Sequence, residues 1–182
     1  MTDSLDAALA HYSPHGSNER ADVGRVRALV ASGDPWPRSL PLHVTGSAVI
    51  VHRATRRVLL RWHARQNAWL QVGGHGDPGE TDPLQVALRE GREETGLADL
   101  VPWPNGGIVH VTIVPVPAAR HEPAHEHADV RYVLATETPE LATPESPGAA
   151  LRWLPVEEAI AEIEEENLRE TLRRVRQLFD ST

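Results

Sequence analysis

The 182-residue sequence contains neither cysteine nor lysine. Without cysteine, the chain can form no disulfide, no thiolate metal site and no cysteine nucleophile. All 18 basic residues are arginine, which excludes Schiff-base chemistry and the phosphate-binding lysine of a P-loop. Any recognition of phosphate must therefore come from arginine, from backbone amides or from a bound metal ion.

Aromatic residues are also scarce, at 4% of the chain, and five of them are tryptophan. We interpret one of these, Trp36, as a packing anchor. The first residues, MTDSLDAALAHYS, have no basic start and no long apolar run, so we expect no signal peptide, no membrane segment and a cytoplasmic location. The formal net charge of −8 argues against binding of long nucleic acid. A small anionic substrate stays possible, because a bound cation inverts the local field.

The length and an apolar content of 40% suit one packed domain with an appendage. Residues 1–38 are predicted to form a helical arm, with one short helix and a second helix that Ser17 caps and that ends near Gly33. Three prolines in GDPWPRSLP then separate the arm from a domain over residues 39–182. The arm could cover the domain, contribute to a homodimer or lean over the site.

The predicted domain alternates between strands and helices. β-Branched and alternating patterns predict strands over 42–53, 57–63, 68–73, 108–116, 130–137 and 150–155. The third of these runs into a glycine-rich loop, a helix follows that loop, and residues 156–179 are predicted to form one long helix. This order is compatible with a mixed sheet that carries helices on both faces.

The loop and the helix that follow the third strand carry the strongest pattern. Four glycines fall within seven residues, at positions 73, 74, 76 and 79, and such a loop can present bare peptide groups to a ligand. Asp82 is a suitable N-cap, Pro83 suits the first helical position, Gln85 occupies the third position of a capping box, and Gly96 ends the helix.

One face of this predicted helix is acidic. Glu90, Glu93 and Glu94 are spaced at i, i+3 and i+4, so their charges repel one another and raise each other's pKa. A hard divalent cation with oxygen ligands would relieve that repulsion. A solvated charged face is the simpler interpretation of the run, but it does not explain the glycine loop, Glu80 or the helix caps.

The whole stretch resembles the signature of the Nudix hydrolases: Gly, five residues, Glu, seven residues, then Arg-Glu-aliphatic-any-Glu-Glu-any-Gly-aliphatic. The matching positions are Gly74, Glu80, Arg89, Glu90, Glu93, Glu94, Gly96 and Leu97. Eight residues rather than seven separate Glu80 from Arg89, which affects the placement of Glu80 most. Gly91 fills the first aliphatic position, where it could let another chain segment approach closely.

The resemblance implies an α/β/α sandwich with a mixed sheet. It also implies metal-dependent hydrolysis of a diphosphate bond in a nucleoside diphosphate linked to another moiety. The carboxylates of Glu90, Glu93 and Glu94 and the carbonyl of Gly74 would bind Mg²⁺ or Mn²⁺. Arg89 would hold Glu80 in place through a charge-assisted pair.

The resemblance leaves several roles open. The general base would be Glu93 or a carboxylate of a later loop, where Glu126 is preferred to Asp129 and Glu122. In the family, the strand before the signature and its neighbour contribute to substrate contacts. The substrate-binding residues implied here are Arg61, His63, Trp69 and Gln71, although Trp69 could be a core residue and Arg61 a surface residue.

The later loop, PAARHEPAHEHAD over residues 117–129, contains the metal-ligand types His121, His125 and His127. Their spacing is that of a strand start or a loose loop rather than the i, i+4 pair of a helical zinc motif, which argues against a dedicated transition-metal site. Pro115 and Pro117 lie where family subgroups differ, but neither identifies the nucleotide-derived substrate.

Three other functions are alternatives to hydrolysis. An isopentenyl diphosphate isomerase of the same fold relies on a cysteine and is excluded. A Nudix domain that senses a nucleotide metabolite without cleaving it stays open as the alternative. An interaction protein with a solvated acidic helix would leave the glycine loop and the caps without a purpose.

Overall fold

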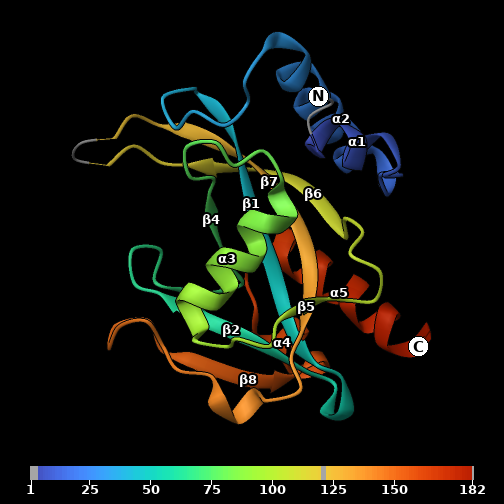
Figure 1. Ribbon diagram of the computed structural model, residues 1–182, viewed down its shortest axis with the longest axis vertical. Helices are drawn as coiled ribbons and strands as arrows, with labels where there is room; N and C mark the ends of the chain where they lie inside the picture. The colour runs from blue at the N-terminus through green and yellow to red at the C-terminus, as the bar shows by residue number, and fades with distance from the viewer. Residues whose placement is uncertain (1–3, 120–121, 182) are drawn as a thin grey trace.

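The computed structural model describes residues 4–119 and 122–181 and contains one eight-stranded sheet between helices (Figure 1). The strand order is β3–β2–β1–β7–β5, with β4 paired to β1, β6 to β7 and β8 to β2. Strands β1 and β7 run parallel and the other pairs antiparallel, so the predicted mixed sheet is confirmed.

The elements have the following bounds. The strands are β1 Leu42–His52, β2 Arg57–His63, β3 Ala68–Leu70, β4 Val72–His75, β5 Val101–Pro102, β6 His110–Val116, β7 His125–Ala135 and β8 Leu151–Pro155. The helices are α1 Ser4–Ala10, α2 Gly16–Ser32, α3 Pro83–Thr95, α4 Val156–Glu162 and α5 Glu166–Ser181.

Strand β1 lies at the centre of the sheet, and both of its faces are buried. Ala48 and Ile50 pack in one core with residues of α1, α2 and α3, whereas Val49 and Val51 pack in a second core with residues of α4 and α5. Successive side chains of a strand point to opposite faces. The odd-numbered residues of β1 therefore face α5, and Figure 1 shows α3 and α5 on opposite sides of the sheet.

Helix α3 begins and ends where its sequence predicts. The Asp82 side chain accepts a hydrogen bond from the backbone N–H of Leu84 at 2.9 Å, and Gly96 takes the left-handed conformation at the C-cap. A Cβ atom on Gly91 would lie 3.0 Å from a methyl of Leu100 and 3.4 Å from one of Leu134. Gly91 therefore allows the close approach that its position in the signature suggested.

The N-terminal arm packs onto the domain. Leu5, Leu9, Val23 and Val26 are buried in the core that also contains α3, and Trp36 is buried there as the predicted packing anchor. Helix α2 begins at Gly16, and its N-cap is His15, two residues before the predicted Ser17 cap.

Three predicted elements differ from the structure. The strand predicted over 68–73 is two strands, β3 paired to β2 and β4 paired to β1. Strand β7 begins at His125 rather than at residue 130, because His125 pairs with β6 and residues 126–129 pair with both β1 and β6. The earlier His121 lies outside the described residues. The single helix predicted over 156–179 is two helices, α4 and α5. The buried residue between them, Ile163, adopts an extended conformation, and its carbonyl accepts hydrogen bonds from the Arg169 side chain.

None of the helices in the described part of the chain combines the length and the apolar character that crossing a bilayer requires.

Candidate active site

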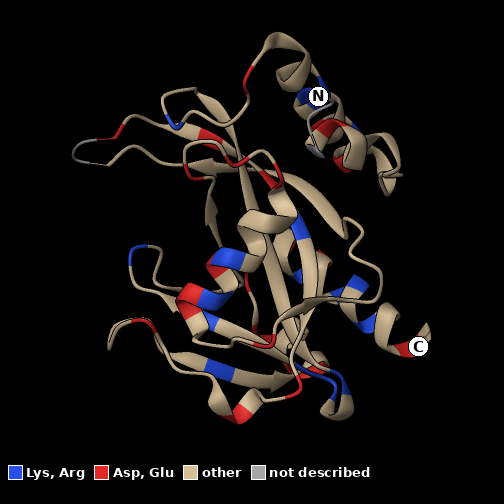
Figure 2. Ribbon diagram, in the orientation of Figure 1, with Lys and Arg blue, Asp and Glu red and all other residues tan. Residues whose placement is uncertain are grey.

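Arg89 joins the predicted carboxylates of α3 and its loop. Its guanidinium donates hydrogen bonds to Glu80 at 3.0 Å, to Glu90 at 3.0 Å and to Glu93 at 3.0 Å, and it also donates to the backbone carbonyl of His75 at 2.8 Å. Figure 2 shows acidic and basic positions together along the second half of α3. The extra residue between Glu80 and Arg89 does not separate this pair, and the hydrogen bond from Arg89 lowers the pKa of Glu80.

Gly73 and Gly74 in β4 separate α3 from the opposite side of the sheet. A Cβ atom on Gly74 would lie 2.4 Å from a carboxylate oxygen of Glu90. A Cβ atom on Gly73, whose φ is +148°, would instead lie 2.2 Å from the Cβ of Ser47. These two glycines therefore let a carboxylate approach the strand from one side and a β1 side chain from the other.

Glu94 is the most deeply buried of the helix glutamates. Its carboxylate accepts a hydrogen bond from the backbone N–H of Gly73 at 3.1 Å and lies 3.3 Å from Nε of Arg61. Burial raises the pKa of Glu94 to about 7, although Arg61 and the Gly73 N–H act to lower it. Burial also raises the pKa of Glu90. Burial therefore outweighs the nearby arginines, Arg89 at Glu90 and Arg61 at Glu94, in setting the pKa of both carboxylates.

A cavity of about 250 Å³ lies on the other side of the two glycines. Thr45 and Ser47 line it from β1, Asp129 and Arg131 from β7, and Gly73 and Gly74 from β4. Glu165, from the break between α4 and α5, and Asn167, from the first turn of α5, complete the lining on that side. This cavity brings hydrogen-bonding side chains next to the glycine segment.

The four predicted substrate-binding residues have separate locations. His63 and Gln71 line the cavity, and the buried Oε1 atom of Gln71 accepts no hydrogen bond within the described residues. Arg61 instead forms ion pairs with Glu94 and Glu145. Trp69 stacks edge-to-face on Trp62, with ring centroids 5.4 Å apart, and packs against the second core.

The structure does not bring Glu126 into the cavity. Its side chain lies on the opposite face of β7 and forms an ion pair with Arg25 of α2 at 2.5 Å. Asp129, the less favoured residue, lines the cavity and is buried. It accepts hydrogen bonds from Thr45, Ser47, Gln71 and Arg131.

Sequence reasoning missed the polar floor of the cavity on β1 and β7, together with Glu165 and Asn167. Extending the alternation of β7 back to His125 would have placed Asp129 and Arg131 on one face. No comparable sequence pattern identifies Glu165 and Asn167, because the acidic segment that contains them is predicted to be helical.

The fold, the glycine segment and the arginine–carboxylate cluster together define a Nudix domain. A sequence model of the NUDIX domain matches residues 42–178, and the chain belongs to this family.

Individual relatives are more distant. A probable DHNTP pyrophosphohydrolase from Lactococcus lactis subsp. cremoris (strain MG1363) is 34% identical over 87 residues, which cover 47% of this chain; the match spans 50% of that relative's length. An Ap4A hydrolase structure from C. elegans has a TM-score of 0.60 and 19% identity, and covers 76% of this chain and 98% of its own. The E. coli dihydroneopterin triphosphate pyrophosphohydrolase has a TM-score of 0.57 and 20% identity, with coverages of 79% and 97%. The two solved structures share the fold with this chain.

Proposed function

We propose that this protein is a metal-dependent Nudix pyrophosphohydrolase that cleaves a diphosphate bond in a nucleotide-derived substrate. The arrangement around Arg89 carries the proposal, because one guanidinium holds Glu80, Glu90 and Glu93 together, and Glu90 lies against Gly74. A solvated acidic helix would not need its carboxylates gathered in this way. A cytoplasmic location stays part of the proposal.

The residues of α3 fit a hard divalent cation. Glu94 is buried and Glu90 partly buried, burial raises the pKa of both carboxylates, and a nearby cation would favour their charged forms. Glu90, Glu93, Glu94 and the Gly74 carbonyl would hold the ion, and this all-oxygen set suits Mg²⁺ or Mn²⁺. When bound, the ion would neutralise charge on phosphate oxygens and activate water.

The side chains of the protein would perform the remaining steps. Arg89 would position the carboxylates, and Arg61 would orient Glu94 from β2. Glu93 is our preferred general base, because its side chain is 57% exposed and therefore open to a water molecule. Glu126 is a weaker choice, because its side chain lies on the face of β7 that points away from the cavity, where it pairs with Arg25.

The cavity would receive the non-phosphate part of the substrate. Gln71 has an unpaired buried acceptor, and Thr45, Ser47, Asp129 and Asn167 offer further hydrogen-bonding groups. Such a lining suits a polar ring with donors and acceptors on its edge. The phosphates of the substrate would extend from this ring towards Gly73 and Gly74.

Pyrophosphate and phosphate release from a panel of substrates tests the proposal. The panel contains dihydroneopterin triphosphate, Ap4A, nucleoside triphosphates and ADP-ribose, each with Mg²⁺ or Mn²⁺. We expect turnover that Glu94→Gln and Glu93→Gln lower by roughly 10²–10⁴-fold. The control Glu140→Gln, at an exposed position, should retain the wild-type rate. Absence of turnover together with metal-dependent nucleotide binding would instead identify a sensor domain.

A further inference from the structure

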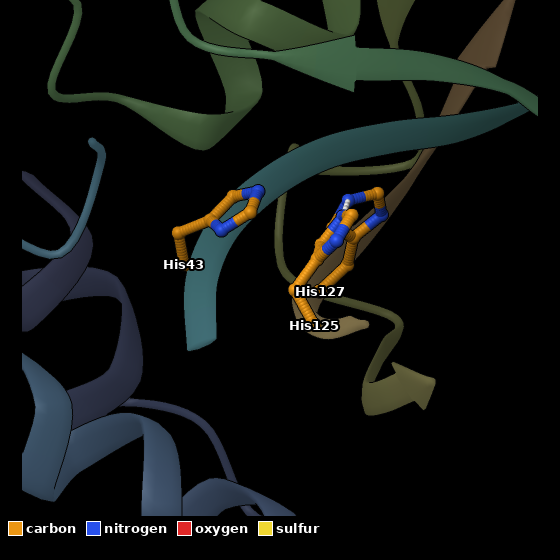
Figure 3. Close-up of side chains that lie close together, drawn as sticks. All are labelled: His43, His125 and His127. Atoms are coloured by element: carbon orange, nitrogen blue, oxygen red, sulfur yellow. Dashed lines mark hydrogen bonds between the residues drawn. The ribbon is translucent and has the colours of Figure 1, made fainter. Parts of the chain in front are cut away.

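Four histidines gather at one end of the cavity, away from the helix glutamates. The Nε2 atoms of His43 and His75 are 3.0 Å apart, and those of His125 and His127 are 3.1 Å apart. Ligand atoms of His43, His125 and His127 all lie within 4.8 Å of one another. Figure 3 shows His43 on β1 facing the other two at the start of β7.

The register of three neighbouring strands produces this group. His43 of β1 is the partner of His127 across the parallel β1–β7 pair, and His125 lies two residues earlier on the same face of β7. Thr45, two residues after His43, is the partner of His75 in β4. Imidazoles from three strands therefore meet on the face of the sheet that contains the cavity.

Hydrogen bonds at the other ring nitrogen orient two of these imidazoles. Nδ1 of His43 is 3.0 Å from the carbonyl oxygen of Leu40, and Nδ1 of His125 is 2.9 Å from that of Pro123. A carbonyl can only accept, so each Nδ1 carries the proton and each Nε2 presents its lone pair to the group. Metal-binding histidines show this same support by a backbone carbonyl.

We propose that His43, His125 and His127 bind one transition-metal ion of the Zn²⁺ class, with His75 as the fourth ligand. Zinc holds imidazole nitrogens at about 2.0–2.1 Å, so two nitrogens on one ion are at most about 4.2 Å apart. The ligand atoms of His43, His125 and His127 lie within 4.8 Å of one another, so rotation of these rings would bring them to that limit, and Nε2 of His75 is already 3.0 Å from Nε2 of His43. Imidazole donors favour zinc and its neighbours, whereas the carboxylates of α3 favour Mg²⁺ or Mn²⁺.

This site goes beyond the hydrolase proposal and does not depend on it. The spacing within residues 125–129 argued against a transition-metal site, because His43 and His75 are distant in sequence. His75 and His127 also line the cavity. His75 directly follows Gly74, and its carbonyl accepts the hydrogen bond from Arg89. An ion on His75 and His127 would therefore fasten β4, with its two glycines, to β7.

Zinc titration of the untagged full chain tests the site. The protein is first treated with a chelator and then titrated calorimetrically with Zn²⁺ alone, in excess Mg²⁺ and without any nucleotide. We expect one zinc per chain and, after substitution with Co²⁺, the visible absorption of four-coordinate cobalt. His125→Gln and His127→Gln should each weaken zinc binding by at least about 100-fold. This is more than the loss of a residue that only supports a metal ligand would cause.

Matched variants separate this site from the carboxylates and from misfolding. His52→Gln, at the other end of β1, and the double variant Glu90→Gln/Glu94→Gln should both retain zinc binding. Far-UV circular dichroism checks each fold, and zinc should raise the melting temperature of the wild type. No stoichiometric zinc in the wild type would overturn the proposal. So would wild-type affinity in folded His125→Gln and His127→Gln, or a loss of zinc confined to the glutamate double variant.

Discussion

At the scale of single residues, the candidate active site depends on the shape of one guanidinium. Arg89 contacts three carboxylates and one carbonyl at once, because its planar fork offers five donors in fixed directions. A lysine ammonium has three donors on a flexible stem and cannot span the same set. The absence of lysine from the chain is thus consistent with the way this cluster is built.

Replacement of Arg89 by lysine should therefore lower the rate without unfolding the protein. We expect kcat to fall by about 100-fold, because misplacement of catalytic groups by about 1 Å costs that much. Steady-state kinetics on the best substrate of the panel checks this prediction. Arg92→Lys on the exposed face of the same helix is the control, and equal rates for both variants would contradict it.

At the scale of elements, helix α2 covers the free edge of β6. Glu19 accepts a hydrogen bond from the backbone N–H of Val111 at 3.0 Å, and Asp22 accepts one from Ile113 at 3.0 Å. Glu19 also forms a buried ion pair with Arg174 of α5 at 2.9 Å. The carboxylates of α2 therefore accept hydrogen bonds from backbone N–H groups of β6 that could otherwise pair with a strand of another chain.

The pH dependence of stability should report on Glu19. Burial alone would raise its pKa, but hydrogen bonds from Arg174, Tyr12 and two backbone N–H groups outweigh it and lower the pKa to about 2. A lowered folded-state pKa gives stability that is complete above the unfolded value of 4.5 and is lost as the pH falls towards 2.

We therefore expect Glu19→Gln to destabilise the protein by roughly 1–3 kcal/mol at pH 7, since it leaves Arg174 with a weaker partner. The difference from wild type should shrink as the pH falls below 4.5. Urea unfolding at several pH values measures it, with the exposed Glu164→Gln as the control. A difference that stays constant down to the acid transition would show that the charge of Glu19 does not stabilise the fold.

At the scale of the whole molecule, the arm contributes to the core of the domain. Leu5, Leu9, Val23 and Val26 are each at most 1% exposed and share one core with Trp36 and α3. Burial of one such side chain is worth about 1.5–3 kcal/mol. The family match begins at residue 42, so this part of the core comes from outside the matched region.

Removal of residues 1–38 should consequently destabilise the remaining domain and change its association. We expect a lower melting temperature, by roughly 2–4 °C for each kcal/mol lost, and concentration-dependent oligomers that pair through the uncovered β6 edge. Calorimetry and size-exclusion chromatography measure both effects. Arg25→Gln in the full chain, which removes only the ion pair to Glu126, should change neither. A monomeric truncated domain with the wild-type melting temperature would instead make the arm an independent appendage.

The sequence was most informative where function depends on local spacing. Helix α3, its caps and the Glu80–Arg89 pair all follow from residues near one another in the chain. The mixed sheet followed from the family resemblance together with the order of elements. Local patterns of this kind predict the structure well because they concern contacts between residues that are close in the chain.

The remaining features depend on contacts between distant strands. The cavity joins β1 to β7 and the helix break, and the histidines come from positions 43, 75, 125 and 127. Strand register decides whether Asp129 or Glu126 faces the cavity, because a shift by one residue exchanges the two faces. The residue pattern of a single segment does not predict its register with the neighbouring strands.

Gly73 and Gly74 divide the molecule into two regions that evolution could alter separately. The carboxylates of α3 approach these glycines from one side, and the polar residues at positions 45, 47, 63 and 71 lie on the other. On the proposed function, exchange of the latter side chains would change which substrate ring the cavity accepts and leave the carboxylates of α3 in place. On the proposed function, strand β4 alone would separate the hydrolytic residues from the substrate-binding residues. The same hydrolysis could then act on different substrates, provided that neither glycine of β4 acquires a side chain.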